Sequence, residues 1–258
     1  MRRKLVDFVL LVLLVGAVWQ GLHHLVGEEA LSAPGETIAY LLRYLRDPKF
    51  WMHAGATSLA LGYALAIAIG GGLLIGLPLG LNRAAGDVAD PYLIALFSIP
   101  KITLYPVILL LFGLSLSGKV AFGAIHGLFP IALFTMSGVR SIPRTYLKTA
   151  RAMRLSRFDT IRSVAFPAAL PEIVTGVRIG TASTILGTLI GEMFAATEGL
   201  GFVLIKAIER NEVQIIMALT LLLFIVSSTL NTLLLVLEHR LHRRAAVVGR
   251  EAGAPAAR

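Results

Sequence analysis

Six apolar runs, each long enough to cross a lipid bilayer, constrain this chain more than any other feature. A helix needs about 20 predominantly apolar residues to span the hydrocarbon core. Soluble domains are about 45–50% apolar and about 25% charged, whereas this chain is 56% hydrophobic and 15% charged. The sequence therefore predicts an all-α integral membrane protein with six transmembrane helices, at Leu5–Val26, Ala54–Leu81, Pro91–Leu114, Val120–Val139, Pro171–Ala195 and Val213–Leu237.

The distribution of basic residues predicts the orientation of these spans. Cytoplasmic segments of membrane proteins carry an excess of Lys and Arg. With the amino terminus inside, most of the 24 Lys and Arg residues fall in the inner segments, and both termini are cytoplasmic. The basic start at Met1–Lys4 resembles a secretory signal, but no cleavage site follows cleanly, so we expect a retained helix. A basic excess of this kind indicates cytoplasmic loops and no nucleic-acid partner.

The chain divides into three parts. Residues 1–53 comprise the first transmembrane helix and an outer loop, in which a short amphipathic helix is expected around Thr37–Leu45. Residues 54–240 form the membrane core, which includes the inner loop at 140–170. The Ala- and Gly-rich tail at 241–258 is expected to be disordered.

The inner loop, Arg140–Leu170, is the most informative segment. It holds seven of the basic residues, and long ordered loops are usually functional. Basic and apolar residues recur on opposite faces with helical spacing, which predicts a first helix. Ser156 and Asp159 form a Ser-x-x-Asp capping box, which predicts a second helix, and Pro167 and Pro171 are expected to stop that helix. The loop is therefore predicted to be a helix, a bend and a helix.

Two interpretations of this loop remain open on physical grounds. Basic and apolar faces suffice for helices that lie on anionic lipid at the membrane surface. The same faces also suit a docking element for a cytoplasmic protein.

A resemblance to a known family favours docking. The loop resembles the EAA loop of the permeases of ATP-binding-cassette (ABC) importers, whose pattern is Glu-Ala-Ala, three residues, Gly, nine residues and Ile-x-Leu-Pro. Its counterparts here are Lys148-Thr149-Ala150, Arg154 and Val164-Ala165-Phe166-Pro167. Five further landmarks are similar to the branch that transports nitrate, sulfonate and taurine: Ile99-Pro100-Lys101, Tyr105-Pro106, Gly176-x-Arg178, Glu192-Met193 and Gly199-Leu200-Gly201.

Two residues depart from the family pattern. Arg154 replaces the family's Gly, which would suit a helix end that needs a positive φ. Either the bend is made differently or Arg154 bears backbone strain. Lys148 replaces Glu and so reverses one charge at the expected contact.

The resemblance implies a type I ABC-importer permease in the bacterial cytoplasmic membrane. It implies a second permease copy as a homodimer partner, two cytoplasmic ATPase subunits, an extracytoplasmic substrate-binding protein and surrounding membrane lipid. This chain would bind no cofactor and catalyse no reaction, because the partner ATPases would bind ATP and Mg²⁺. The inner loop would provide coupling helices that dock on the ATPase through Tyr146, Lys148, Ala150, Met153, Arg154, Ser156, Arg157, Phe158 and Asp159.

A second set of candidate residues lies within the spans and at the outer end. Gly199, Leu200 and Gly201 precede a short apolar helix that resembles the family's outer gate, with an ordinary turn and interfacial helix as the alternative. Charges inside a span are functional candidates by default. We expect Glu192 to have a structural or gating role, with hydration near the outer interface as the alternative. Lys101 is expected to donate to backbone carbonyls that the nearby prolines leave without a helical hydrogen bond, with contact to an anionic cargo as the alternative.

Two further residue patterns concern packing between spans. Arg178 is expected to pair with an acid of another span or to extend to the inner surface. The glycines at 70–72 and 76 favour close helix packing that includes the second copy, with a hinge as the alternative.

Other functions are less consistent with the sequence. A secondary carrier would show inverted repeats, and an intramembrane hydrolase would need a nucleophile–base pair or zinc ligands. The six histidines have no metal-ligand spacing, and there is no Cys. Six spans alone do not exclude a channel. The cargo stays open among sulfonate, nitrate, taurine, bicarbonate and a vitamin precursor.

Overall fold

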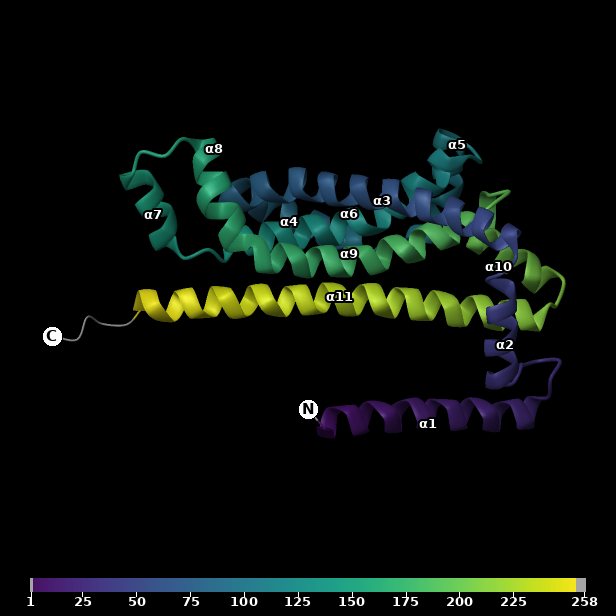
Figure 1. Ribbon diagram of the computed structural model, residues 1–258. Helices are drawn as coiled ribbons and strands as arrows, with labels where there is room; N and C mark the ends of the chain where they lie inside the picture. The colour runs from purple at the N-terminus through teal and green to yellow at the C-terminus, as the bar shows by residue number, and fades with distance from the viewer. Residues whose placement is uncertain (1, 254–258) are drawn as a thin grey trace.

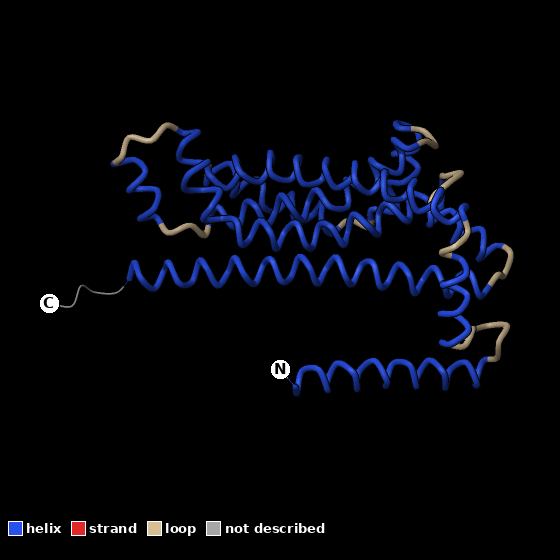
Figure 2. Tube along the Cα trace, in the orientation of Figure 1, coloured by secondary structure: helices blue, strands red, loops and turns tan. Residues whose placement is uncertain are grey.

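The computed structural model describes residues 2–253, and every regular element within this range is a helix (Figures 1 and 2). In chain order these are α1 (Arg2–Val26), α2 (Pro34–Tyr44), α3 (Pro48–Leu81), α4 (Arg83–Ser98), the 3₁₀ helix η1 (Lys101–Leu104), α5 (Tyr105–Phe112), α6 (Leu116–Arg140), α7 (Arg144–Ala152), α8 (Arg157–Thr160), the π-helical turn η2 (Ile161–Ala165), α9 (Phe166–Ala195), α10 (Leu200–Glu209) and α11 (Val213–Gly253).

Five of the predicted spans are helices long and apolar enough to cross a membrane, and the third span is a bent pair. The α4 axis and the η1–α5 axis meet at 86°, so the prediction of one helix over Pro91–Leu114 is wrong. Ile99 is extended, with ψ at 134°, because the residue before a proline avoids the helical region, and α4 therefore ends ahead of Pro100. The segment still crosses the bundle, since α6 begins near α10 and ends beside Arg83 at the opposite end. The fold therefore has six crossings.

The two ends of the bundle differ in content. α7 and α8 extend from one end, and α1 begins and α11 ends toward that same end (Figure 1). α2, α5 and α10 lie at the opposite end. The end with α7 carries the basic inner loop, so it is the cytoplasmic end. This arrangement agrees with the predicted orientation.

The core is built on close contact of α6 with α3 and α9. Small residues of α3 recur every four positions and are buried, namely Ala60, Ala64, Ala68, Gly72, Gly76 and Gly80. A Cβ at Gly72 would lie 2.5 Å from Ile131 Cγ2 of α6. The expected close packing is therefore confirmed, but the helix that Gly72 and Gly76 contact belongs to the same chain and not to a second copy.

The inner loop continues into the fifth span without a break. Pro167 and Pro171 were expected to stop a helix, and this expectation is wrong, because α8, η2 and α9 follow one another directly. In an α-helix the ring of Pro167 would clash with the carbonyl of Ser163 and remove its hydrogen bond. The π turn avoids this conflict, since the Phe166 N–H bonds to the Ile161 carbonyl five residues back.

The amphipathic helix expected in the outer loop around Thr37–Leu45 is confirmed as α2. The boundaries of two other segments differ from expectation. α3 begins at Pro48 rather than at Ala54, with the Asp47 carboxylate accepting from the Lys49 N–H at its start. α11 continues to Gly253, past the point where the sequence predicts a disordered tail, and residues 254–258 lie outside the described range.

Candidate coupling loop and outer gate

The described side chains of α7 are exposed except for that of Ala150, which is buried. The helix begins after Pro143. Tyr146 is 37% exposed and Met153 is 67% exposed. Of the residues predicted to dock on the ATPase, Ala150 therefore contacts the protein's own core, while Tyr146, Lys148 and Met153 lie on the accessible surface.

α7 ends in a Schellman motif centred on Arg154. The Arg154 N–H bonds to the Arg151 carbonyl at 2.9 Å, and the Leu155 N–H bonds to the Ala150 carbonyl at 3.1 Å. This motif places its C′ residue in the left-handed region, where glycine is usual. Arg154 has φ of 53°, so the alternative in which this residue bears the strain is confirmed.

The second helix of the loop begins at the predicted capping box. The Asp159 N–H donates to Ser156 Oγ at 3.1 Å, and the Ser156 hydroxyl donates to the Asp159 carboxylate at 2.6 Å. Phe158 is 69% exposed beside this cap. Arg157 is the first residue of α8, and its side chain lies outside the described part of the structure. The loop thus presents an exposed aromatic ring on a firmly capped helix start.

At the opposite end of the bundle, Glu192 is fully buried. Its carboxylate accepts from the Thr57 hydroxyl at 2.8 Å and from the Gly201 N–H at 3.0 Å, and Lys119 Nζ lies 3.6 Å away. Glu192 is therefore not hydrated at the interface. Sequence reasoning missed Thr57 and began the fourth span at Val120, just after Lys119, although Lys119 lies in α6 and is 5% exposed.

The same cluster holds the start of α10. The Leu200 N–H donates to Thr57 Oγ1 at 2.8 Å, and the Gly199 N–H donates to His53 Nδ1 at 3.1 Å. Gly199 has φ of 120°, and a Cβ on Gly199 or Gly201 would collide with Glu192. The first amides of a helix favour a negative charge. The carboxylate of Glu192 therefore joins α10 to α3, α6 and α9.

Two further charges inside the spans, Lys101 and Arg178, have partners. Lys101 Nζ donates to the Phe97 carbonyl at 2.7 Å, close to the helix end before Pro100. Of the two partners expected for Lys101, the structure therefore shows a backbone carbonyl. Arg178 Nε donates to the Glu238 carboxylate of α11 at 2.6 Å, which confirms pairing with an acid of another span. Among the described side chains, no group of His, Cys, Asp and Glu could hold a metal ion.

Comparisons with known proteins match most of the chain. The family described as "Binding-protein-dependent transport system inner membrane component" matches residues 68–247. The taurine transport system permease protein TauC of Escherichia coli is 28% identical over 195 residues, which are 76% of this chain and 71% of TauC. The formylaminopyrimidine transport permease protein ThiX of Halalkalibacterium halodurans is 30% identical over 193 residues, which are 75% of this chain and 77% of ThiX.

Two further matches come from another transporter and from a solved structure. The nitrate import permease protein NrtB of Synechococcus elongatus is 28% identical over 200 residues, which are 72% of this chain and 70% of NrtB. A chain of the inward-facing MetNI methionine ABC transporter superposes with a TM-score of 0.62 at 17% identity, covering 76% of this chain and 98% of that chain. At this identity the superposition establishes the fold alone.

Proposed function

The chain belongs to the family of binding-protein-dependent transport system inner membrane components, and we propose that its α7–α8 loop couples an ATPase to the translocation path. As a family member it is a multi-pass permease subunit of an ABC importer in the inner membrane. Such permeases work with ATPase and substrate-binding-protein partners.

We propose an assembly of two copies of this chain with two cytoplasmic ATPase subunits and one external binding protein. In this assembly the ATPases bind ATP and Mg²⁺ and hydrolyse the nucleotide, while this chain forms the path and performs no chemistry. α1 supports the pairing of two copies, because most of its apolar side chains are exposed and its described tertiary contacts are with α2 and the adjoining loop.

The observation that carries the coupling proposal is the exposure of Phe158 at the cytoplasmic tip. Burial of a Phe side chain in a partner's groove contributes about 1.5–3 kcal/mol. Tyr146 and Lys148 are exposed along α7, and Met153 and the α8 start lie on either side of the bend. The basic residues orient the partner by electrostatic attraction. We assign these residues to ATPase docking, with Arg154 shaping the bend between the two helices.

The helix that follows Phe158 supports transmission to the outer side. Phe158–Phe194 is an apolar helical segment of 37 residues, in which α8 is steeply inclined to α9 (Figure 1). Glu192 lies near its far end and holds the start of α10. A displacement of α8 by the ATPase would therefore move the contact between Glu192 and residues 199–201, as in a rigid-body switch. We assign this contact to the outer gate.

The cargo proposed for this importer is a small nutrient that carries an oxyanion group, such as taurine, another sulfonate or nitrate. The support is the naming of several relatives for these compounds. A vitamin precursor is the alternative, because the relative ThiX is named for formylaminopyrimidine. A thermal-shift screen of a binding protein encoded beside this chain, with these compounds as ligands, would distinguish the two classes. We assign no direct cargo contact to Lys101, whose ammonium group already donates to a carbonyl.

Substitution of Phe158 tests the coupling proposal. We expect Phe158→Ala to abolish the stimulation of ATPase activity by the loaded binding protein in the reconstituted transporter, because the apolar anchor is lost. Phe224→Ala is the matched control, since Phe224 of α11 is also 69% exposed and lies outside both the loop and α1, so stimulation should be unchanged. Full stimulation in the Phe158→Ala transporter would contradict the proposal, and ATP-independent uptake would favour a secondary carrier or a channel.

A further inference from the structure

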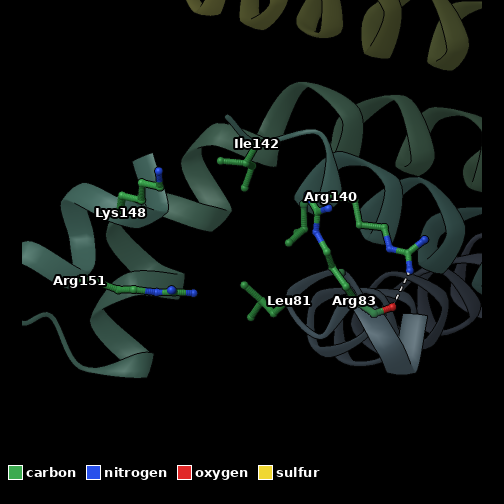
Figure 3. A pocket seen from close by; sticks show the side chains of 8 residues that line it. Leu81, Arg83, Arg140, Ile142, Lys148 and Arg151 are labelled. Atoms are coloured by element: carbon green, nitrogen blue, oxygen red, sulfur yellow. Dashed lines mark hydrogen bonds between the residues drawn. The ribbon is translucent and has the colours of Figure 1, made fainter. Parts of the chain in front are cut away.

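A cavity of about 380 Å³ lies at the cytoplasmic end of the bundle, between α7 and the inner ends of α3, α4 and α6 (Figure 3). A second cavity of about 690 Å³ shares three of its lining residues, Leu81, Arg83 and Arg151. Together they form a recess beneath the last turn of α3. The first cavity is lined by Gly80, Leu81, Arg83, Val139, Arg140, Ile142, Lys148 and Arg151.

The charged residues around this recess are nearly all of one sign. Arg83 comes from α4, Arg140 from α6, and Lys148 and Arg151 from α7 (Figure 3). Among the described side chains, Arg140 forms an ion pair, with Asp87 at 2.6 Å, whereas Arg83, Lys148 and Arg151 form none. Arg140 Nε is buried and has no hydrogen-bond partner within the described part of the chain.

Like charges gathered around a recess repel, and because Arg83, Lys148 and Arg151 are exposed, water partly screens this repulsion. An oxyanion between them would remove this repulsion and accept charge-assisted hydrogen bonds. The planar fork of arginine matches the geometry of phosphate oxygens. We propose that this recess is a binding site for a phosphate-type oxyanion, held by Arg83 and Arg151 with Arg140 and Lys148 beside them.

The position of the recess relates it to the membrane surface. Leu81 is the last residue of α3, so Arg83 lies where the span meets the cytoplasm. Leu81, Val139 and Ile142 give the cavity an apolar side next to its cations. Both a phospholipid headgroup and a phosphate ion from the cytoplasm present the oxyanion that these side chains recognise. Either would link α7 to α4 and so stabilise the loop against the bundle.

The test uses the complete purified transporter in detergent and measures its melting temperature. Three probes are titrated at matched ionic strength: dihexanoyl phosphatidylglycerol, dihexanoylglycerol, which has the same acyl chains without the phosphate, and inorganic phosphate. We expect phosphatidylglycerol to raise the melting temperature more than dihexanoylglycerol does, because only the phosphate-bearing lipid binds the folded recess, and a ligand that binds only the folded state stabilises it. A matching response to inorganic phosphate would assign the site to a soluble anion, and no such response would assign it to the lipid headgroup.

Two variants connect the response to the recess. Arg83→Gln and Arg151→Gln should each weaken the apparent affinity by at least about tenfold, the effect of losing one charge-assisted hydrogen bond. Arg162→Gln is the control, because Arg162 is exposed on the same end of the molecule and lines neither cavity.

Three outcomes would overturn the proposal. Equal shifts with dihexanoylglycerol, which lacks the phosphate, would indicate apolar binding. A shift that persists in the Arg83→Gln/Arg151→Gln double variant would place the anion elsewhere. No response to any probe, together with loss of the ATPase subunit from the double variant on purification, would show that an acidic side chain of the ATPase occupies the recess.

Discussion

At the residue scale, backbone conformation and burial explain the unusual positions in this sequence. The spacing of the EAA-like pattern places Arg154 at a bend, and the structure places that residue in the left-handed region with φ of 53°. The pattern did not predict whether the bend retains a positive φ when arginine replaces the family's glycine. Glu192 could be identified from the sequence because a carboxylate within a span is unfavourable. Its partners Thr57 and Lys119 could not, because they come from other helices.

Restoring glycine at the bend should stabilise the permease. A non-glycine residue in the left-handed region costs about 1 kcal/mol, so Arg154→Gly should raise the free energy of unfolding by about that amount. Ala152→Gly provides the contrast, because residue 152 lies inside α7 and glycine there should lower stability by about 0.5–1 kcal/mol. Thermal unfolding of the purified transporter measures both changes. Destabilisation by Arg154→Gly would show that the positive φ carries no strain.

Neutralising Glu192 should destabilise the outer gate. Removal of one partner from a buried ion pair costs about 3–5 kcal/mol, because the remaining charge is left uncompensated. Glu192→Gln leaves Lys119 in this state, and the additional change Lys119→Met should recover part of the loss. Glu198→Gln, at an exposed acid near α10, is the control. If the single and double variants unfold at the same temperature, the ion pair makes no contribution.

At the element scale, prolines and glycines determine where helices break and where they touch. Pro100 ends α4, whereas Pro167 is accommodated by the π turn η2, and hydropathy alone does not distinguish these two outcomes. The α3 glycines could be recognised as a packing surface from their spacing. Their partner could not, because any neighbouring helix of this chain or of a second copy would satisfy the pattern. The structure assigns the contact to α6.

The tight contact between α3 and α6 should make Gly72 intolerant of even one methyl group. A Cβ there would lie 2.5 Å from Ile131 Cγ2 and 3.1 Å from the Ala132 nitrogen. Overpacking of this kind costs about 1–3 kcal/mol, so Gly72→Ala should lower the melting temperature. Gly70→Ala is a matched control on the same helix, since a Cβ at Gly70 meets nothing within 4 Å. Equal stability of the two variants would contradict the packing described here.

At the scale of the whole molecule, the number of crossings and their orientation could be predicted, because hydropathy and charge act on each segment separately. The arrangement of the crossings could not, since it depends on which faces pack together. Two consequences became visible only in three dimensions. α1 lies apart from the central bundle (Figure 1), and an uninterrupted helical path leads from Phe158 at the cytoplasmic tip to Glu192 at the outer end.

The central claim is that the α7–α8 loop lies on the cytoplasmic side against the ATPase. Because the chain contains no cysteine, Met153→Cys and Ile208→Cys each introduce a single thiol, at the end of α7 beside the bend and on α10 at the opposite end, and both leave the Phe158 ring in place. We predict that a membrane-impermeant maleimide labels the first variant only in inside-out vesicles and only when the ATPase is absent, and labels the second only in right-side-out vesicles. Labelling of Met153→Cys from outside, or equal labelling with and without the ATPase, would contradict the account.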